Sequence, residues 1–298
     1  MKLAILGFGE AAQAFALGFQ GEGSLEKLSA YDIRIDDPAQ ADGLKEKARQ
    51  LGVFLASSMP EAVSGAGVIL SVVQGSAAPK VSAAVAPHLQ PDQIFIDLNS
   101  ISPAAKRVVA QPILDRGHTG YVEGAIMDAV RPKNHKVPIL LAGPRALEAA
   151  EKLNAVGMNC EAIGEKIGQA SSVKMIRSVM MKGVEALILE SMAAAETAGV
   201  TERILDSING TFAGLDWRKL TSHYLKRTHE HGLRRVTEMK ESASTISGLG
   251  MHPFMSTAIA ETIAAGHARL ARVPYDANAQ YTDLLPILIS SADTVKKP

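Results

Sequence analysis

The sequence predicts an α/β protein in which an N-terminal Rossmann-type, doubly wound domain is followed by an all-α C-terminal domain. Three observations predict this arrangement. Short apolar runs alternate with helix-forming segments, a glycine-rich turn follows the first run, and from residue 168 on no strand pattern of comparable strength appears. Strands that alternate with helices are typical of βαβ units and of a largely parallel sheet. We therefore place a dinucleotide-binding domain at residues 1–163 and a helical domain for substrate binding and dimerisation at residues 164–298.

Each expected strand is a short apolar run. In chain order these runs are residues 3–6, 29–35, 53–55, 68–73, 94–98, 121–127 and 137–142. The run at 68–73 is almost continuously apolar, as expected for a parallel strand that is buried on both faces. Helices are expected at 11–19, at 38–51 with a proline in the first turn, and at 168–198, the last with a length of about 45 Å.

The composition limits the classes of partner and the compartment. Among 298 residues, 31 Lys and Arg balance 31 Asp and Glu, so no overall charge favours nucleic acid or an acidic membrane. The single cysteine, Cys160, fits a reducing compartment, and no Cys/His cluster has the spacing of zinc ligands. No apolar stretch reaches the roughly 18–20 residues of a membrane span. We expect a cytoplasmic protein that binds no nucleic acid, no membrane and no metal.

The glycine-rich turn predicts a dinucleotide site, because it fits the pattern G-x-G-x-x-A between an apolar strand and an alanine-rich helix. The first glycine permits the tight turn, the second lets the backbone approach a pyrophosphate, and the small third residue lets helix and strand pack closely. The alternative is a turn that only packs a helix on a strand. The carboxylate in this turn is unfavourable near a pyrophosphate unless it points away. The residues expected at the cofactor are Gly7, Phe8, Gly9, Glu10, Ala11 and Ala12.

Two residues in the last part of the second expected strand bear on the choice of cofactor. Asp32 lies where an acidic residue accepts hydrogen bonds from both ribose hydroxyls of NAD. Arg34 lies where a cation neutralises the 2′-phosphate of NADP, although it can also be a solvated loop charge. The two cues conflict, so NADP and NAD both stay open, with a slight preference for NADP.

Polar residues follow the buried run at 94–98. Asn99 and Ser100 stand where ligands gather at the carboxyl ends of parallel strands, and they can hold a nicotinamide ribose or a substrate hydroxyl. The alternative is a helix start before Pro103, for which Ser102 is a suitable N-cap.

The start of the long helix carries a second set of polar residues. Lys174 lies three residues before Arg177 and four before Ser178, so these side chains can share a helix face. A desolvated lysine beside another cation has a lowered pKa and can act as a general base or acid. The alternative is a solvated helix charge.

Three motifs together carry a resemblance to a known family. They are Gly7-x-Gly9-x-x-Ala12, Asp97-x-Asn99-Ser100 and Gly168-x-Ala170-x-x-x-Lys174. In this order and with the long helix they resemble the β-hydroxyacid dehydrogenase superfamily, which contains 6-phosphogluconate dehydrogenase and 3-hydroxyisobutyrate dehydrogenase. The resemblance covers nearly the whole chain. Residues 231–241 are similar to a segment of a little-characterised branch with a 6-phosphogluconate dehydrogenase-like helical domain.

The resemblance implies an NAD(P)-dependent oxidoreductase that transfers a hydride between nicotinamide and a small hydroxy acid, or its keto acid or semialdehyde. It gives Lys174 the role of general acid and base and puts Asn99 and Ser100 on the nicotinamide side. It also puts Val73 and Gln74 on a loop along the cofactor. Oxidation yields a 3-keto acid, and decarboxylation can follow. A homodimer formed through the helical domain is implied as well.

The sequence departs from the family on the substrate side. The family's Ser-Gly-Gly loop is replaced by a segment with Met127 and Asp128, and the asparagine one turn past the lysine is replaced by Arg177 and Ser178. We therefore do not expect the substrates of the two named enzymes. A small anionic substrate held by the forked guanidinium of Arg177 fits these residues, and an ion pair between helices is the alternative.

Three basic residues lie at helical spacing in the second domain: His231, Arg234 and Arg235. They can close over an anionic substrate, also from a partner subunit, or form a solvated basic face that Glu238 and Glu241 balance. The lost substrate loop leaves two other functions open, a cofactor-binding regulatory or assembly protein with decayed catalysis and an imine reductase-like enzyme. Retention of Lys174 argues against the latter.

Overall fold

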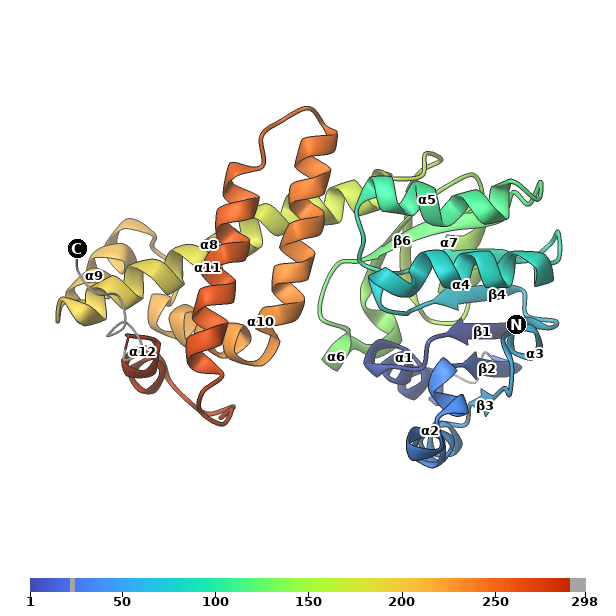
Figure 1. Ribbon diagram of the computed structural model, residues 1–298, viewed down its shortest axis with the longest axis horizontal. Coiled ribbons are helices and arrows are strands. Elements are labelled where there is room, and N and C mark those ends of the chain that lie inside the picture. Colours follow the sequence, from blue (N-terminus) through green and yellow to red (C-terminus); the bar gives the residue numbers. More distant parts are fainter. Residues whose placement is uncertain (22–24, 290–298) are drawn as a thin grey trace. The chain divides into compact units, whose positions relative to one another are not determined.

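The structure is a computed structural model that describes residues 1–21 and 25–289 and divides into two compact units (Figure 1). The first unit is Met1–Lys174 and the second begins at Met175, so the division falls inside the long helix α8, Gln169–Thr197. The boundary expected from the sequence, after residue 163, lies before this helix. The residues from 290 to the end of the predicted helical domain lie outside the described residues.

The first unit is built on an eight-stranded sheet with the order β3-β2-β1-β4-β5-β6-β7-β8. All neighbouring strands are parallel except β6 and β7, which run antiparallel. This sheet, followed by helices, confirms the predicted fold class. The strands are β1 Lys2–Leu6, β2 Lys27–Tyr31, β3 Phe54–Leu55, β4 Val68–Ser71, β5 Ile94–Asp97, β6 Tyr121–Ile126, β7 Pro138–Ala142 and β8 Asn159–Gly164.

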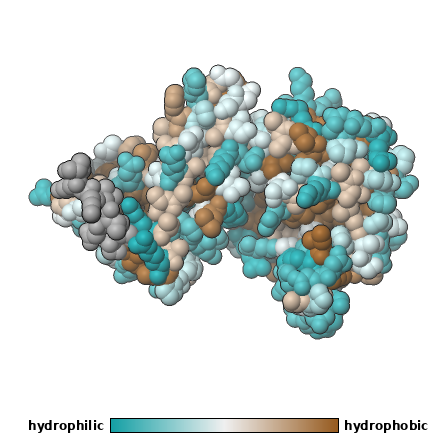
Figure 2. Space-filling view, viewed as in Figure 1, coloured by the Kyte–Doolittle hydropathy of each residue, from teal (hydrophilic) through white to brown (hydrophobic). Residues whose placement is uncertain are grey.

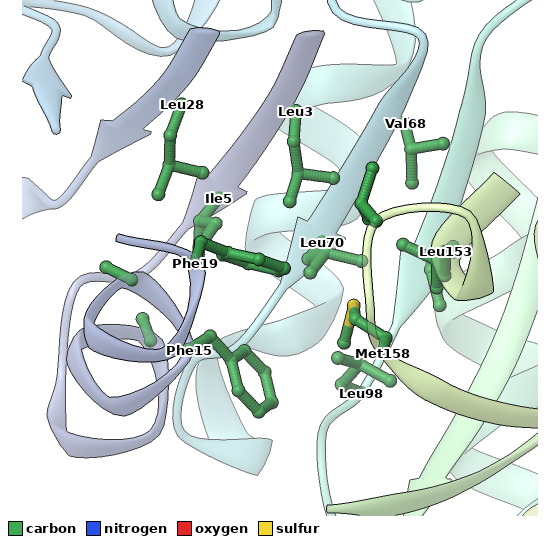
Figure 3. Close-up of a cluster of buried hydrophobic side chains, with 14 of the residues drawn as sticks. Leu3, Ile5, Phe15, Phe19, Leu28, Val68, Leu70, Leu98, Leu153 and Met158 are labelled. Atoms are coloured by element: carbon green, nitrogen blue, oxygen red, sulfur yellow. The ribbon is translucent and has the colours of Figure 1, made fainter. Parts of the chain in front are cut away.

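Apolar side chains cover both faces of this sheet. Alternate residues of β1 point to opposite faces, so Leu3 and Ile5 belong to one buried cluster while Ala4 and Leu6 belong to another. Figure 3 shows the first cluster, in which Phe15 of α1 faces the strands. The helices of this unit are α1 Glu10–Phe19, α2 Pro38–Gln50, α3 Met59–Val63, α4 Ala78–Val85, α5 Pro103–Leu114, α6 Val130–Lys133 and α7 Ala146–Asn154, with 3₁₀ turns at Ile33–Asp36, Gly75–Ala77, Ala86–His88 and Asn134–Lys136.

Two strand predictions need correction. The strand expected to reach residue 35 ends at Tyr31, because the side chain of Asp32 accepts a hydrogen bond from the backbone N–H of Arg34 and starts a 3₁₀ turn. The strand β8 was not expected. It lies at the edge of the sheet, where polar residues such as Asn159 and Glu161 face solvent, so its sequence lacks the apolar run of the central strands.

The second unit contains only helices among its described residues, as predicted from the sequence. Beyond α8 these are α9 Thr201–Thr211, α10 Trp217–Gly248, α11 Phe254–Leu270 and α12 Tyr281–Ile289. Its core includes Leu189, Leu225, Met239 and Ile263. Helices α10 and α11 approach closely at Gly232, where an added Cβ would lie 2.5 Å from Cβ of His267.

The surface is of mixed character. Hydrophilic and hydrophobic residues are intermixed over the face shown in Figure 2. Among the described residues, no helix combines the length and the apolar character that crossing a membrane requires.

Candidate active site

The two glycines of the turn between β1 and α1 differ in the space around them. Gly7 has no space for a side chain, whereas Gly9 has. Gly7 adopts φ +90°, and an added Cβ would lie 2.5 Å from the carbonyl oxygen of Val72, so only glycine fits. At Gly9 the described residues, apart from Gly9 and its two chain neighbours, place no heavy atom within 4 Å of the position a Cβ would take. Gly9 is also the N-cap of α1, and no side chain caps this helix. The open side therefore offers backbone N–H groups and a helix dipole to an anion, as a pyrophosphate requires.

Asp32, which follows β2, is hydrogen-bonded to this turn. Its Oδ2 accepts hydrogen bonds from the backbone N–H of Phe8 at 2.7 Å and from Nη2 of Arg34 at 2.7 Å. Its Oδ1 accepts from the backbone N–H and from Nε of Arg34, at 3.0 and 2.8 Å. Burial opposes the charge of Asp32, but the hydrogen bonds from Arg34 and Phe8 outweigh it and lower the pKa of the carboxyl. Both oxygens of Asp32 are thus engaged within the protein.

Arg34 is held in a fixed position by these contacts. Besides its two bonds to Asp32, its Nη2 donates to the carbonyl oxygen of Phe8 at 3.2 Å. It borders a cavity of about 420 Å³ whose lining also includes Gln13, Gln40 and Lys47. The region beside the glycine turn therefore carries two cations and two amides, a set that suits an anionic group.

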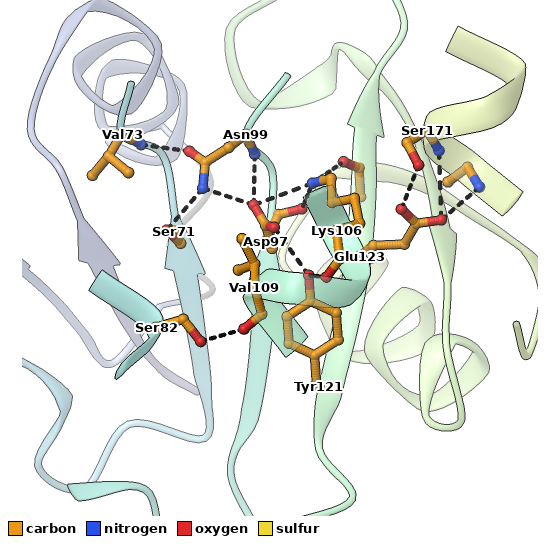
Figure 4. Close-up of polar contacts among 12 residues, drawn as sticks. Ser71, Val73, Ser82, Asp97, Asn99, Lys106, Val109, Tyr121, Glu123 and Ser171 are labelled. Carbon is orange, nitrogen blue, oxygen red and sulfur yellow. Dashed lines mark hydrogen bonds and ion pairs between the residues drawn. The ribbon is translucent and has the colours of Figure 1, made fainter. Parts of the chain in front are cut away.

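Asn99 joins the carboxyl ends of β4 and β5 (Figure 4). Its Oδ1 accepts from the backbone N–H of Val73 at 2.7 Å, and its Nδ2 donates to Oδ1 of Asp97 at 2.7 Å and to Oγ of Ser71 at 3.1 Å. The amide hydrogens of this buried side chain are therefore used inside the protein. Asn99 holds the loop with Val73 and Gln74 over the glycine turn, while a direct contact with nicotinamide stays a prediction, as it does for the half-buried Ser100.

Asp97, to which Asn99 donates, is part of a buried ion pair that the sequence analysis did not predict. Nζ of Lys106 lies 3.1 Å from Oδ1 of Asp97 and donates to the carbonyl oxygens of Asp97 and Gly124 at 2.6 and 3.3 Å. The hydroxyl of Tyr121 donates to Oδ2 of Asp97 at 3.0 Å, and burial together with the Asp97 charge raises the pKa of Tyr121. The sequence spacing could have indicated that Lys106 is buried, since it occupies the same face of α5 as the buried Val109 and Ile113.

A second buried acid, Glu123 of β6, was not predicted as a site residue either. Its Oε1 accepts from the backbone N–H groups of Gly168 and Ala170, both at 2.8 Å, and its Oε2 accepts from Oγ of Ser171 at 2.8 Å. Figure 4 shows this carboxylate facing the start of α8. The signal was a carboxylate inside an apolar run, because a buried charge needs dedicated partners.

Lys174 is the last residue of the first unit, two turns into α8 and half-buried. Of the residues that replace the family's substrate loop, Met127 is half-buried and donates its backbone N–H to the carbonyl oxygen of Pro138. Asp128 is exposed and pairs with Nζ of Lys133 at 2.7 Å. The carboxylate of Asp128 is therefore compensated by a neighbouring cation.

In the second unit, α8 presents an exposed Arg177 and a buried Ser178. Oγ of Ser178 accepts from Nζ of Lys182 at 3.2 Å, and Lys182 pairs with Glu238 at 2.9 Å. Burial lowers the pKa of Lys182, and the charge of Glu238 opposes this shift. Ser178 thus belongs to a buried polar group between α8 and α10.

The three basic residues of α10 do not converge. Arg234 is exposed, and His231 lies 3.3 Å from its neighbour Glu230. Arg235 is buried and turned to Glu185 of α8, with Nε 2.9 Å from Oε1 and Nη2 in contact with Oε2. A solvated basic face therefore describes Arg234 but not Arg235, and a substrate role for these residues stays a prediction.

Comparison with known proteins gives matches to both units. Residues 2–100 match the family described as NADP oxidoreductase, coenzyme F420-dependent. Residues 195–265 match a domain of unknown function, DUF1932. The match at the N-terminus covers the glycine turn and Asn99.

Two solved structures are similar over most of the chain. A conserved hypothetical protein from Sinorhizobium meliloti 1021 is 50% identical, with 97% of this chain and 96% of that chain covered and a TM-score of 0.80. The conserved protein MTH1747, of unknown function and reported to be structurally similar to 3-hydroxyacid dehydrogenases, is 31% identical, with 90% of this chain and 97% of that chain covered and a TM-score of 0.72.

A further structure shares the fold at lower identity. The 3-hydroxyisobutyrate dehydrogenase of Mycobacterium tuberculosis, in complex with L-serine, is 18% identical, with 97% of this chain and 98% of that chain covered and a TM-score of 0.74. This likeness extends over both the α/β and the helical part of the chain.

Proposed function

Since this chain belongs to the β-hydroxyacid dehydrogenase superfamily, we propose that it is an NAD(P)-dependent oxidoreductase acting on a small hydroxy acid, or on its keto acid or semialdehyde. The observation that carries the proposal is the presence of Lys174 in the same compact unit as the open glycine turn. Lys174 also stands on a helix whose first residues are bonded to the central sheet through Glu123.

The residues of the glycine turn fit a dinucleotide. The empty space at Gly9 and the uncapped start of α1 suit a pyrophosphate, and the loop with Val73 and Gln74 is fixed by Asn99 on the other side. A bound nicotinamide cofactor would accept or supply a hydride. The chain's own residues bind it and orient it.

Lys174 would move the proton of the reaction. In the oxidative direction its Nζ takes the proton of the substrate hydroxyl while the C–H bond at the same carbon breaks, and in the reductive direction it returns that proton. The support is the position of Lys174 in the motif Gly168-x-Ala170-x-x-x-Lys174. Decarboxylation of a 3-keto acid is a further part of this proposal.

NADP is the cofactor that the geometry at β2 favours. The carboxylate of Asp32 is occupied by Phe8 and Arg34, so it has little remaining capacity for two ribose hydroxyls. Arg34 keeps a bidentate contact with Asp32 and borders a cavity with a second cation, Lys47. A 2′-phosphate beside Arg34 would use this charge.

The substrate in this proposal is a small anion held by Arg177. A guanidinium matches a carboxylate with two parallel hydrogen bonds, and Arg177 is exposed on α8. A cytoplasmic homodimer formed through the helical unit is also proposed. It is supported by exposed apolar residues along α8, namely Ile176, Met180 and Leu187.

The proposal is tested with Lys174→Ala. Turnover of NADPH and NADH is measured across a panel of 3-keto acids and semialdehydes, and cofactor affinity is measured separately by fluorescence titration. We expect a loss of about 10²- to 10⁴-fold in kcat with unchanged cofactor affinity, because a positioned general acid contributes in this range. Lys166→Ala, which removes an exposed lysine just before α8, is the matched control and should keep normal turnover.

Two results contradict the proposal. Normal kcat in Lys174→Ala on the substrate that the wild type accepts would remove the lysine mechanism. Tight binding of cofactor by the wild type with no turnover across the whole panel would favour a regulatory or assembly protein, the reading that the replaced loop at Met127 and Asp128 supports.

A further inference from the structure

Glu123 is a buried carboxylate that the proposed proton transfer does not use. It lies in the third position of β6 and has no exposed surface. Removing a charge from water costs several kcal/mol unless hydrogen bonds compensate it. The hydrogen-bond partners of Glu123 therefore indicate the role of its buried charge.

Among the described residues, the hydrogen-bond donors to Glu123 lie at the start of α8. One oxygen accepts the backbone N–H groups of Gly168 and Ala170, and the other accepts the hydroxyl of Ser171. These N–H groups precede the first intrahelical hydrogen bonds and carry the positive end of the helix dipole. A carboxylate is the side chain that satisfies them best, and this one comes from the sheet rather than from the helix's own sequence.

The backbone on the helix side is built for this contact. Gly168 adopts φ +109°, and an added Cβ would lie 3.2 Å from Cβ of Pro103. A residue with a side chain is strained at this φ and crowded in this place. The chain can therefore turn its N–H groups toward Glu123 only with glycine at position 168.

This contact fixes both the position and the rotation of the first turns of α8, which belong to the same unit as Glu123. Ser171 and Lys174 are three residues apart and lie on neighbouring parts of one helix face. A slip of one residue in the helix would turn the lysine by about 100°. Strand β6 continues from Glu123 to Ile126 and then to Met127, so one strand carries both the helix anchor and the start of the proposed substrate loop.

We propose that Glu123 is the positioning residue for Lys174, and that it acts by holding the first turn of α8 against β6. The inference rests on the proposed function, in which Lys174 is the general acid and base. It assigns Glu123 no contact with substrate or cofactor. An error of about 1 Å in the place of a reacting group can cost about 10²-fold in rate, which sets the scale of the expected effect.

Two conservative variants of Glu123 separate the effect of its side-chain length from the effect of its charge. Glu123→Gln keeps an acceptor oxygen at the same distance from Gly168 and Ala170 but removes the charge, and Ser171 can then accept a bond from the new amide. Glu123→Asp keeps the charge but is one methylene shorter. Positioning predicts that Glu123→Gln retains more kcat than Glu123→Asp, with the KM for cofactor unchanged in both. The reverse order overturns the inference, since it would indicate a role of charge alone.

A double-mutant cycle shows whether Glu123 acts through Lys174. Single-turnover rates with enzyme in excess are measured for Glu123→Asp, Lys174→Ala and the double variant. We expect Glu123→Asp to lower the rate about 10²-fold in the wild-type background and to have little effect once Lys174 is absent. An equal loss in both backgrounds overturns the inference and leaves the proposed function intact. Normal activity of Lys174→Ala alone would instead remove the proposed function itself.

Discussion

Asp97 and Glu123 face each other in the register of β5 and β6, and each of these two buried carboxylates is neutralised by a different kind of partner. Asp97 pairs with the ammonium group of Lys106. Glu123 binds the first N–H groups of α8. Two adjacent buried acids would repel each other strongly without such partners, so the carboxyl edge of the sheet depends on both.

Replacing Lys106 tests the first of these partners. Lys106→Met keeps much of the side-chain length but leaves Asp97 as a buried charge without its cation. We expect a loss of about 3–5 kcal/mol in the free energy of unfolding, measured by urea denaturation, because breaking one half of a buried pair has this cost. Lys45→Met, at an exposed lysine of α2, is the control and should change stability by no more than about 0.5 kcal/mol. Equal stabilities of the two variants would contradict the role given to the pair.

Replacing the two glycines of the first turn by alanine should have different effects, on stability at Gly7 and on cofactor affinity at Gly9. Gly7→Ala forces a positive φ on a residue with a side chain and drives its Cβ into the carbonyl group of Val72, so we expect a loss of about 1–3 kcal/mol in stability. Gly9 has φ −82° and open space at its Cβ position, so Gly9→Ala should fold normally. Its new methyl group would occupy the place of the pyrophosphate, and NADPH affinity should fall about tenfold or more.

Thermal unfolding and fluorescence titration of the same two preparations check this pair. Gly9→Ala with wild-type NADPH affinity would mean that the open side of the turn is not the pyrophosphate site. A normal melting temperature for Gly7→Ala would contradict the crowding at Val72.

The fold was predictable from the sequence where one local signal dominated. The central strands are apolar on both faces, and the glycine turn has its pattern between a strand and a helix, so both stood out. The edge strand β8 mixes polar and apolar residues because part of it is exposed to solvent. It therefore lacks the apolar run that identifies the central strands. The short turn after Tyr31 depends on one side-chain bond of Asp32, which strand propensity does not reveal.

The candidate site was predictable only in part, because its charged residues bind partners that are distant in the sequence. Lys106 and Asp97 are nine residues apart, while Glu123 and Ser171 are 48 apart. Spacing on one helix suggested that Arg235 faces a ligand together with Arg234, but its partner Glu185 lies on another helix, 50 residues away. A charged residue at an apolar position was the available clue in each case, and it does not name the partner.

Arg34 should decide the preference between the two nicotinamide cofactors. Arg34→Ala removes the cation proposed for the 2′-phosphate and frees the oxygens of Asp32. We expect NADPH affinity to fall about 10- to 100-fold, the value of one or two charge-assisted hydrogen bonds, while NADH affinity stays the same or rises. Arg49→Ala, at an exposed arginine of α2 paired with Glu46, should change neither affinity. A parallel loss for NADPH and NADH would show that Arg34 does not distinguish the cofactors.

Asp32 should contribute stability that disappears in acid. Its pKa is lower in the folded protein than in the unfolded chain, so folding is favoured by its ionised form. The contribution is fully present above the unfolded pKa of about 3.9 and is lost as the pH falls through the folded value. We expect the difference in unfolding free energy between the wild type and Asp32→Asn to be constant near neutral pH and to shrink below about pH 4.

Urea denaturation of both proteins at a series of pH values measures this difference. Asp42→Asn, at an exposed carboxylate of α2, provides the control, and its difference from the wild type should show little dependence on pH. A difference for Asp32→Asn that grows as the pH falls would contradict the sign of the shift.

Neighbouring arginines of α10 provide the last test, because they differ in burial but not in chemistry. Arg235→Met leaves Glu185 buried with Thr228 as its only hydrogen-bond donor among the residues that the structure describes, and we expect a loss of about 3–5 kcal/mol in unfolding free energy. Arg234→Met removes an exposed charge and should cost no more than about 0.5 kcal/mol. If Arg234 also meets the anionic substrate, its variant should raise the KM for that substrate at unchanged stability. An unchanged KM in Arg234→Met would contradict a substrate role of Arg234.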